Sequence, residues 1–176
     1  YVTYAFLHGD LMHLGGNMLF LWVFGDNVED ALGHARYLLF YLAGAAAGAV
    51  AHQFVLPESE IPLIGASGAV AAVVAAYVLL HPRVKLWVLV LGRIPLRLPA
   101  YIPLAMWIGY QLLMLATTPA DLVSWPAHVG GIIAGAIMVI FLRRNGVPLF
   151  DREVVAPQAA VLENGRRRRR EATESR

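Results

Sequence analysis

A serine between two glycines and a distant histidine are the residues of this chain best suited to covalent chemistry. Ser67 lies in the sequence Gly65-Ala66-Ser67-Gly68 at the start of an apolar run, and His128 lies at the start of another. A serine hydroxyl becomes a useful nucleophile when a nearby base takes its proton, and histidine is the commonest base. Each residue also has an ordinary explanation, because serine often caps a helix and histidine can join neighbouring helices by hydrogen bonds. If the two side chains meet, they predict nucleophilic catalysis.

Two polar side chains in the first apolar run could complete such a site. His13 and Asn17 are four residues apart, so on a helix they share one face. One interpretation is that they bond to neighbouring helices. The other is that, together with the backbone N–H of Ser67 at a helix start, they donate hydrogen bonds to an oxyanion.

No carboxylate is placed to complete a catalytic triad. Glu29 and Asp30 fall at the far end of the first apolar run, and Asp121 falls in a predicted loop. We therefore expect a dyad of Ser67 and His128. The absence of cysteine excludes thiol chemistry and cysteine-bound zinc, and we expect no metal and no cofactor.

The elements that must position these residues are apolar enough to lie in a membrane. Of the 176 residues, 59% are hydrophobic, whereas average soluble domains have roughly 45–50%. A spanning helix needs ~20 apolar residues. Apolar runs at about 11–24, 37–55, 66–81, 100–118 and 127–142 predict five helices on this criterion. The predicted fold class is all-α, a polytopic transmembrane helical bundle.

The distribution of charge predicts which helix ends face the cytoplasm. With five spanning helices, all 14 lysines and arginines fall in the segments 25–36, 82–99 and 143–176. The alternate segments, 56–65 and 119–126, carry acidic residues and no basic ones. Because basic loops stay in the cytoplasm, we expect an integral multi-pass membrane protein of the bacterial plasma membrane, with a cytoplasmic C-terminal tail.

The composition divides the chain into a membrane domain, residues 1–144, and a basic tail, residues 145–176. The tail has too few apolar residues to pack, so we expect it to be disordered. Its five arginines at 166–170 are expected to contact membrane lipid, and nucleic acid is not expected as a partner. The run 84–99 is interrupted by prolines and is expected to lie along the inner membrane face.

Glycines on the last predicted helix explain how His128 could approach Ser67. His128, Gly131 and Gly135 fall on one narrow stripe, and the small-xxx-small spacing of the two glycines lets helix backbones pack closely. The helix that starts at Ser67 has a matching face of small residues that begins at Gly68. Packing of these faces is expected to bring His128 to Ser67.

Ser67 is expected to lie below the outer surface of the membrane. A helix from Ser67 to His81 is about 22 Å long, whereas the hydrocarbon core of a bilayer is roughly 30 Å thick. Irregular backbone at that depth is tolerated only inside protein or beside a wet cavity. The loop 57–66 is therefore predicted to dive inwards, where water can reach Ser67.

Taken together, these motifs resemble those of the rhomboid intramembrane serine proteases. The resemblance rests on Ser67 in Gly-Ala-Ser-Gly, on His13 four residues before Asn17, and on Ala127-His128 followed by Gly131. It covers about residues 1–144 and implies a rhomboid-like bundle with five of the six core helices present. It also implies that Ser67 is the nucleophile and His128 the general base. His13, Asn17 and the backbone N–H of Ser67 would line the oxyanion hole.

The resemblance implies an endopeptidase that cleaves transmembrane protein substrates near the outer membrane interface without a cofactor. The alternative is a non-proteolytic rhomboid-like protein that binds or escorts membrane clients, although such relatives typically lack the serine or the histidine. Some family members carry a tyrosine four residues after the serine that packs on the histidine. Here that position is Ala71, so His128 must be held in another way. The family's first helix is absent from this sequence, and we expect the piece alone to be poorly stable or weakly active.

Overall fold

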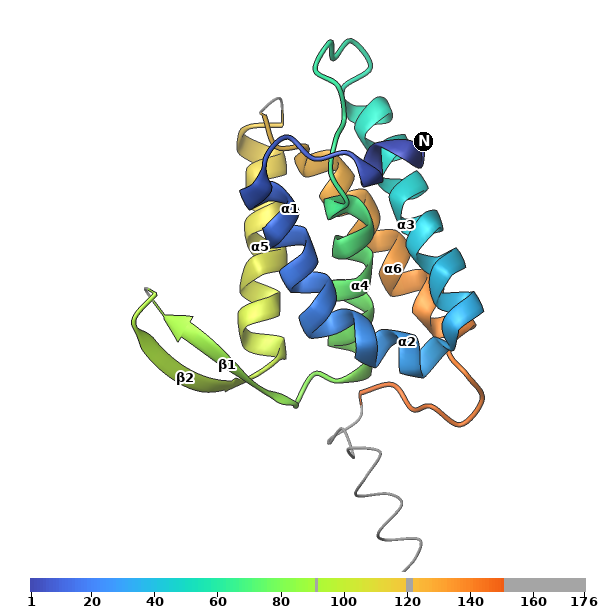
Figure 1. The fold of residues 1–176 in the computed structure, drawn as a ribbon, viewed down its shortest axis with the longest axis vertical. Helices are drawn as coiled ribbons and strands as arrows, with labels where there is room; N and C mark the ends of the chain where they lie inside the picture. Colours follow the sequence, from blue (N-terminus) through green and yellow to red (C-terminus); the bar gives the residue numbers. More distant parts are fainter. Residues whose placement is uncertain (91, 120–121, 151–176) are drawn as a thin grey trace, which may run out of the picture.

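The computed structural model describes residues 1–90, 92–119 and 122–150. Its main helices run side by side, and a small β-hairpin projects from one end of the bundle (Figure 1). A short 3-10 helix at Thr3–Phe6 comes first, followed by α1 (Leu11–Phe20), a π-helical stretch (Leu21–Gly25), α2 (Asp26–Leu32), α3 (His34–Val55), α4 (Ser67–Leu80), β1 (Lys85–Val90), β2 (Ile94–Pro99), α5 (Tyr101–Thr117) and α6 (Trp125–Leu142).

Helix α4 is the buried centre of the bundle. Every residue from Gly68 to Tyr77 is buried, as expected for a helix that is apolar on all sides. The helix packs most extensively against α6 and α3. Because α4 is enclosed along its length, its first residue, Ser67, is held in one place relative to the neighbouring helices.

Close packing between α4 and α6 depends on small residues. A Cβ atom added at Gly131 would collide with the carbonyl oxygen of Gly68, and one added at Gly135 would collide with the backbone of Ala72. Helix α3 approaches in the same way, since a Cβ at Gly48 would lie 2.9 Å from the carbonyl oxygen of Ala127. The glycine positions therefore set the spacing of the three helices, as backbone contact does in other membrane proteins.

The first helical segment is longer than the predicted 11–24. Helix α1 continues through the π-helical stretch into α2 and ends only at Leu32. It stops there because Gly33 adopts a φ of 85°, a conformation that glycine tolerates and that closes many helices. The other helices begin and end within three residues of the predicted runs.

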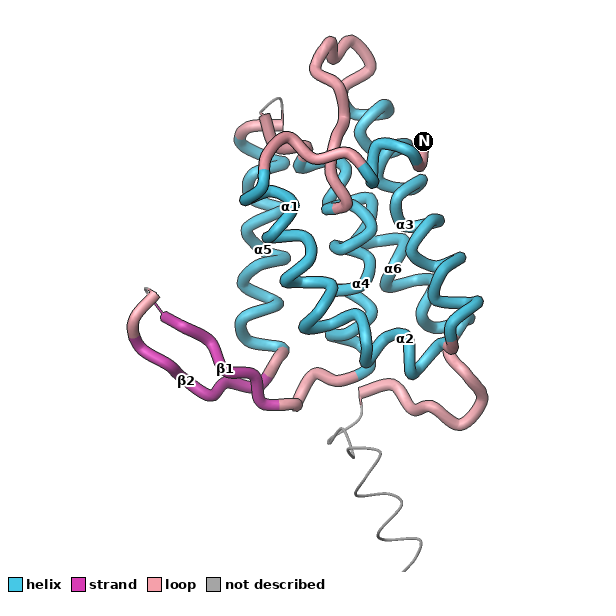
Figure 2. Tube along the Cα trace, in the orientation of Figure 1, coloured by secondary structure: helices cyan, strands magenta, loops and turns pink. Residues whose placement is uncertain are grey.

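The all-α prediction is wrong for residues 85–99, which form an antiparallel hairpin. Lys85 pairs with Pro99 and Val90 with Ile94, and the hairpin extends sideways from the bundle (Figure 2). Gly92 in the connecting turn has a φ of 68°. The apolar run 84–99 could be helix or strand by its sequence alone. A helix would place Pro95 in its interior, where proline removes a hydrogen bond. A two-stranded hairpin tolerates prolines because each strand has a free edge.

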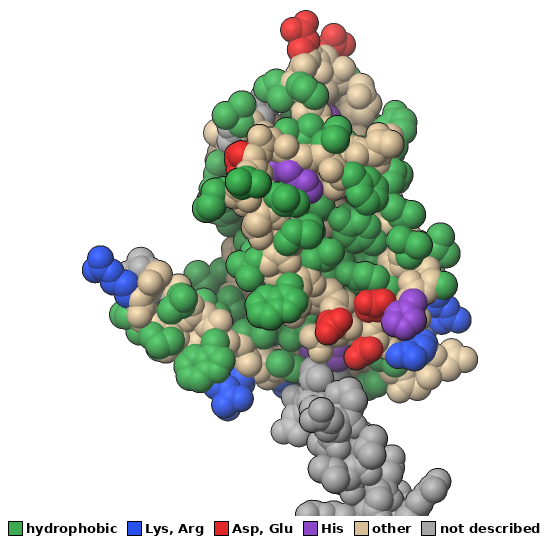
Figure 3. Space-filling view, viewed as in Figure 1, with side chains coloured by type: hydrophobic (Ala, Val, Ile, Leu, Met, Phe, Trp, Pro, Cys, Tyr) green, Lys and Arg blue, Asp and Glu red, His purple; other side chains and the backbone are tan. Residues whose placement is uncertain are grey.

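The surface of the bundle suits a membrane. Helices α3 and α6 are long and apolar enough to cross one by length and composition, and α4 and α5 are shorter apolar helices. Hydrophobic side chains cover the sides in view, and charged side chains gather towards the ends (Figure 3). The described basic residues lie on α3's first turn, on the hairpin or beyond the ends of α4 and α6, which is the end opposite Ser67. This arrangement agrees with the predicted charge asymmetry.

Part of the predicted tail is packed. The backbone N–H of Phe150 donates to the carbonyl oxygen of Leu79 at 2.7 Å. Just before the tail, the N–H of Arg144 donates to the carbonyl oxygen of Ala31 at 2.8 Å. Val147 and Leu149 contact the hydrophobic core. Residues 145–150 therefore pack against the end of the bundle opposite Ser67. The polar sequence that follows them gave no sign of this packing. The rest of the predicted tail, 151–176, and Asp121 lie outside the described residues.

Candidate active site

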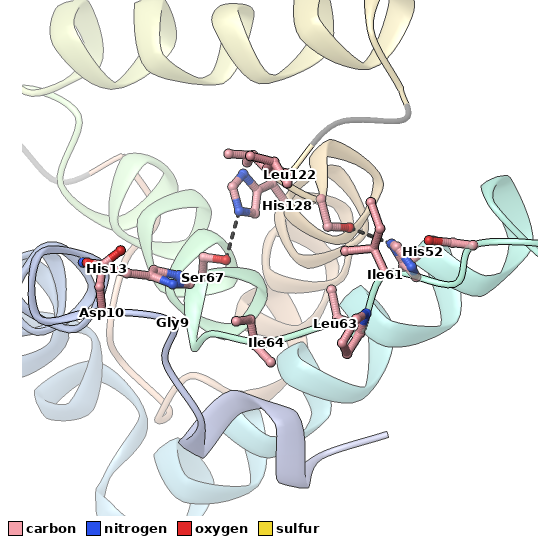
Figure 4. A pocket seen from close by; sticks show the side chains of 14 residues that line it. Gly9, Asp10, His13, His52, Ile61, Leu63, Ile64, Ser67, Leu122 and His128 are labelled. Carbon is pink, nitrogen blue, oxygen red and sulfur yellow. Dashed lines mark hydrogen bonds between the residues drawn. The ribbon is translucent and has the colours of Figure 1, made fainter.

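Ser67 and His128 are in direct contact. The hydroxyl oxygen of Ser67 lies 2.8 Å from Nε2 of His128, within hydrogen-bond distance, as drawn in Figure 4. Ser67 is the first residue of α4 and His128 lies in the first turn of α6, so the packing of these helices creates the contact. His128 is only 9% exposed. The residue at the N-cap of α4 is Ala66, so Ser67 is inside the helix and does not occupy the capping position.

The loop before Ser67 descends into the bundle. Figure 1 shows α4 starting lower than the end of α3, with the connecting loop rising above both and then descending. Gly65 has a φ of 107°, and a Cβ atom there would collide with the imidazole of His13. Its N–H donates to the carbonyl oxygen of Tyr4 at 3.1 Å. Only glycine satisfies both the backbone conformation and the close approach of His13.

His13 and Asn17 lie on α1 beside Ser67. The Asp10 side chain caps α1 by accepting from the backbone N–H of His13 at 2.8 Å. Asn17 is 6% exposed, and its Nδ2 donates to the carbonyl oxygen of His13 at 3.0 Å. The imidazole of His13 meets that of His8 edge to face, with 5.2 Å between ring centroids. The structure thus brings together all four residues that the sequence singles out.

Ser67 and His13 border both a larger and a smaller cavity. The larger one, about 600 Å³, also reaches His128 (Figure 4). Its other walls come from the loop before α4, the segment before α6, Gly9, Asp10 and His52. The smaller one, about 210 Å³, is also lined by Met12, Gly16, Asn17, Phe20, Val70 and Trp107.

The sequence did not predict what holds the other side of His128. Nδ1 of His128 lies 2.8 Å from Oε1 of Gln111. The edge of the imidazole meets Trp125, with ring centroids 5.8 Å apart, and its face stacks on Trp107 at 6.5 Å. These contacts take the place of the tyrosine that is absent at Ala71. The one signal in the sequence was an isolated amide within the apolar run 100–118.

A second histidine and serine pair fixes the start of α6. Nδ1 of His52 lies 2.7 Å from Oγ of Ser124, and the same oxygen accepts from the N–H of Ala127 at 3.3 Å as the helix cap. This contact joins the end of α3 to the first turn of α6. Sequence spacing alone cannot show that His52 meets Ser124.

The acidic residues of the first helical segment lie far from the site, as expected. Glu29 bonds to His34 at 2.5 Å near the opposite end of the bundle. Both ring nitrogens of His128 are occupied by Ser67 and Gln111, so no carboxylate contacts it through them. Within the described residues, no group of three or more histidine, aspartate, glutamate or cysteine side chains could hold a metal ion.

Comparison with known proteins shows the family of this helical bundle. Residues 1–145 match the rhomboid domain. The chain belongs to the rhomboid family.

Curated relatives carry the same family name. The chain is 32% identical to RHOMBOID-like protein 12, mitochondrial, of Arabidopsis thaliana over 160 residues, which covers 82% of this chain and 46% of that protein. It is 28% identical to human Rhomboid-related protein 3, covering 82% of this chain and 36% of that protein. Rhomboid protease GluP of Bacillus subtilis is 32% identical, with 76% and 24% covered. The chain spans less than half the length of these three relatives.

Proposed function

We propose that this chain is the core of an intramembrane serine endopeptidase. The observation that carries the proposal is the 2.8 Å contact between the Ser67 hydroxyl and Nε2 of His128. A nucleophile bonded to a base that a third group orients is the arrangement that serine hydrolases use. One relative is itself named a protease.

In the proposed reaction, the oxygen of Ser67 attacks the carbonyl carbon of the scissile peptide while His128 takes the hydroxyl proton at Nε2. The carbonyl oxygen becomes an oxyanion beside the backbone N–H of Ser67. An amide nitrogen carries two hydrogens. One hydrogen of Asn17 Nδ2 is bonded to the backbone carbonyl oxygen of His13, which leaves the second for the oxyanion. The His13 ring borders the same space.

Collapse of this intermediate breaks the peptide bond. His128 returns its proton to the leaving amine, and the carbonyl carbon stays attached to Ser67 as an ester. A water molecule then attacks the ester and gives a proton to His128, which passes it to Ser67 as the acid product leaves. The larger cavity supplies the route for water, because it joins Ser67 to the end of the bundle that carries the loop before α4.

The proposed substrates are transmembrane proteins, cut near the outer membrane interface. The smaller cavity supports this, because its walls on α1 and α5 are mostly apolar and would accept a peptide that arrives from lipid. The proposed setting is a multi-pass protein in the bacterial plasma membrane, with the basic end of the bundle in the cytoplasm against membrane lipid.

Covalent labelling tests the proposal without a known substrate. Detergent-solubilised protein is treated with a fluorophosphonate, and cleavage of a transmembrane reporter is followed in liposomes. We expect Ser67→Ala and His128→Ala each to abolish both signals, and the double variant to lose no more, because nucleophile and base act as a unit.

The matched control is Ser59→Ala, which removes an exposed serine from the wall of the same cavity and should leave both signals unchanged. Equal cleavage by the wild type and by Ser67→Ala would overturn the protease assignment. It would favour the alternative, a rhomboid-like protein that binds or escorts membrane clients without cutting them.

A further inference from the structure

We propose that Gln111 is a positioning residue that holds the proton of His128 on Nδ1, so that Nε2 is always free to take the proton of Ser67. This inference rests on the proposed function of Ser67 and His128. The site is then a hydrogen-bonded group of serine, histidine and glutamine rather than an isolated dyad.

The burial of Gln111 requires its amide to be bonded on both sides. Gln111 is 2% exposed in a helix with an otherwise apolar middle, and a buried amide without partners costs about 1–3 kcal/mol. It has a partner at each end: Nε2 donates to the carbonyl oxygen of Trp107 at 3.1 Å, and Oε1 lies 2.8 Å from Nδ1 of His128.

The bond to Trp107 fixes which end of the amide faces the histidine. A backbone carbonyl oxygen can only accept a hydrogen bond. Rotation of the amide by half a turn would place two oxygen atoms against each other at the Trp107 end, with no hydrogen between them. The NH₂ group of Gln111 therefore points at Trp107, and its oxygen must face His128.

An oxygen acceptor at Nδ1 selects one form of the imidazole. A neutral imidazole carries one hydrogen, on either Nδ1 or Nε2. With Oε1 of Gln111 as its neighbour, Nδ1 must carry that hydrogen, and Nε2 then presents a lone pair to the Ser67 hydroxyl. The opposite form would leave Oε1 facing a lone pair and would place a hydrogen between Nε2 and the nucleophile.

The packing around His128 cannot make this choice. Trp107 stacks on the imidazole face and Trp125 meets its edge, so both restrict the plane of the ring. Because both ring nitrogens point at oxygen atoms, those of Ser67 and Gln111, neither aromatic ring selects which nitrogen carries the hydrogen. In the described structure the task of selecting the proton's position falls to Gln111.

Substitutions at position 111 separate the amide's chemistry from its volume. Gln111→Leu keeps an apolar side chain of similar size but removes the acceptor. Gln111→Glu, as the neutral carboxylic acid, keeps an acceptor oxygen for His128 and an O–H donor for the carbonyl oxygen of Trp107. We expect the leucine variant to react with fluorophosphonate about 10- to 100-fold more slowly, from the loss of one buried hydrogen bond. The glutamate variant should recover most of the rate. Gln53→Leu, on the exposed end of α3, is the control and should react at the wild-type rate.

The ¹⁵N spectrum of the histidine rings reports the position of the proton independently of activity. In detergent, with His128 assigned by comparison with His128→Ala, we expect Nδ1 to be protonated in the wild type and in Ser67→Ala. Gln111→Leu should give a mixture of the two forms, and Gln111→Glu should restore protonation of Nδ1.

The outcomes distinguish the two proposals. If the wild-type protein does not label at Ser67, the protease proposal is refuted. If in the same protein His128 carries its proton on Nδ1 and Gln111→Leu changes this, the role of Gln111 stands. Unchanged rate and unchanged spectrum in a folded Gln111→Leu variant would overturn the positioning role. If the leucine variant does not fold, a glutamate variant with a proton on Nε2 would overturn it equally.

Discussion

His13 and Asn17 differ from the dyad in what their removal should cost. Each would supply a single donor to the oxyanion, while the backbone N–H of Ser67 stays in place. We expect His13→Ala and Asn17→Ala to lower kcat by about 10²- to 10³-fold, as the loss of one such donor does in other enzymes, rather than to abolish cleavage. The measurement is kcat at saturating transmembrane reporter. Wild-type rates in both variants would reduce the pair to helix packing.

Gly65 is the position where backbone conformation and side-chain contact coincide. Its φ of 107° and the adjacent imidazole of His13 exclude a Cβ atom without movement. We expect Gly65→Ala to lower the free energy of unfolding by about 1–3 kcal/mol and to slow labelling of Ser67, because the loop that leads into α4 must shift. Denaturant titration in mixed micelles and fluorophosphonate labelling measure the two effects.

The control for Gly65 is Gly15→Ala on α1, where an added Cβ meets nothing within 4 Å. This variant should keep the wild-type stability and labelling rate. Equal effects at both glycines would mean that the tight contact between Gly65 and His13 does not matter.

At the scale of elements, the contact between α4 and α6 decides whether Ser67 reaches His128. A methyl group at Gly131 would press against the carbonyl oxygen of Gly68, one residue after the nucleophile. We expect Gly131→Ala to separate the helices, to cost about 1–3 kcal/mol of stability through overpacking, and to reduce labelling of Ser67. Thermal unfolding in detergent and the labelling rate provide the test.

Gly109→Ala on α5 is the matched substitution, since nothing lies within 4 Å of a Cβ there. It should unfold at the wild-type temperature and label at the wild-type rate. A fully active and stable Gly131→Ala variant would show that the two helices can separate without disturbing the site.

The hairpin and residues 145–150 together form much of the basic end of the bundle. The hairpin is tied to α5 by the N–H of Ala100, which donates to the carbonyl oxygen of Val84 at 2.7 Å. Trp87 is 72% exposed, on a strand that also carries Lys85. Aromatic and basic side chains together are typical of a membrane interface, which agrees with the proposed orientation of the bundle.

For the whole molecule, the charge asymmetry predicts its orientation in the membrane. The chain has no cysteine, so a single introduced thiol reports one position. In intact cells we expect Ser59→Cys, in the exposed loop before α4, to react with an impermeant thiol reagent. Arg93→Cys, in the exposed turn of the hairpin, should react only after the membrane is permeabilised. The opposite pattern would invert the topology and place Ser67 towards the cytoplasm.

The positions of four helices and the residues of interest could be predicted from the amino-acid sequence. Long apolar runs can bury their side chains only as helices when lipid surrounds them, so the ranges of α3 to α6 follow from composition alone. Ser67, His128, His13 and Asn17 stand out because polar groups among apolar neighbours need a reason. Their proposed roles stay predictions until the variants are measured.

How those residues are held could be seen only once the helices were packed together. Gln111 and His128 come from different helices, as do His52 and Ser124, and no spacing along the chain indicates which buried polar atoms meet. The hairpin and the packed residues 145–150 were misread because short segments have weak patterns, and their conformation depends on contacts with α4 and α5. Hydrophobic periodicity acts within one segment and is visible in sequence, whereas hydrogen-bond partners are selected when helices pack and are visible only in three dimensions.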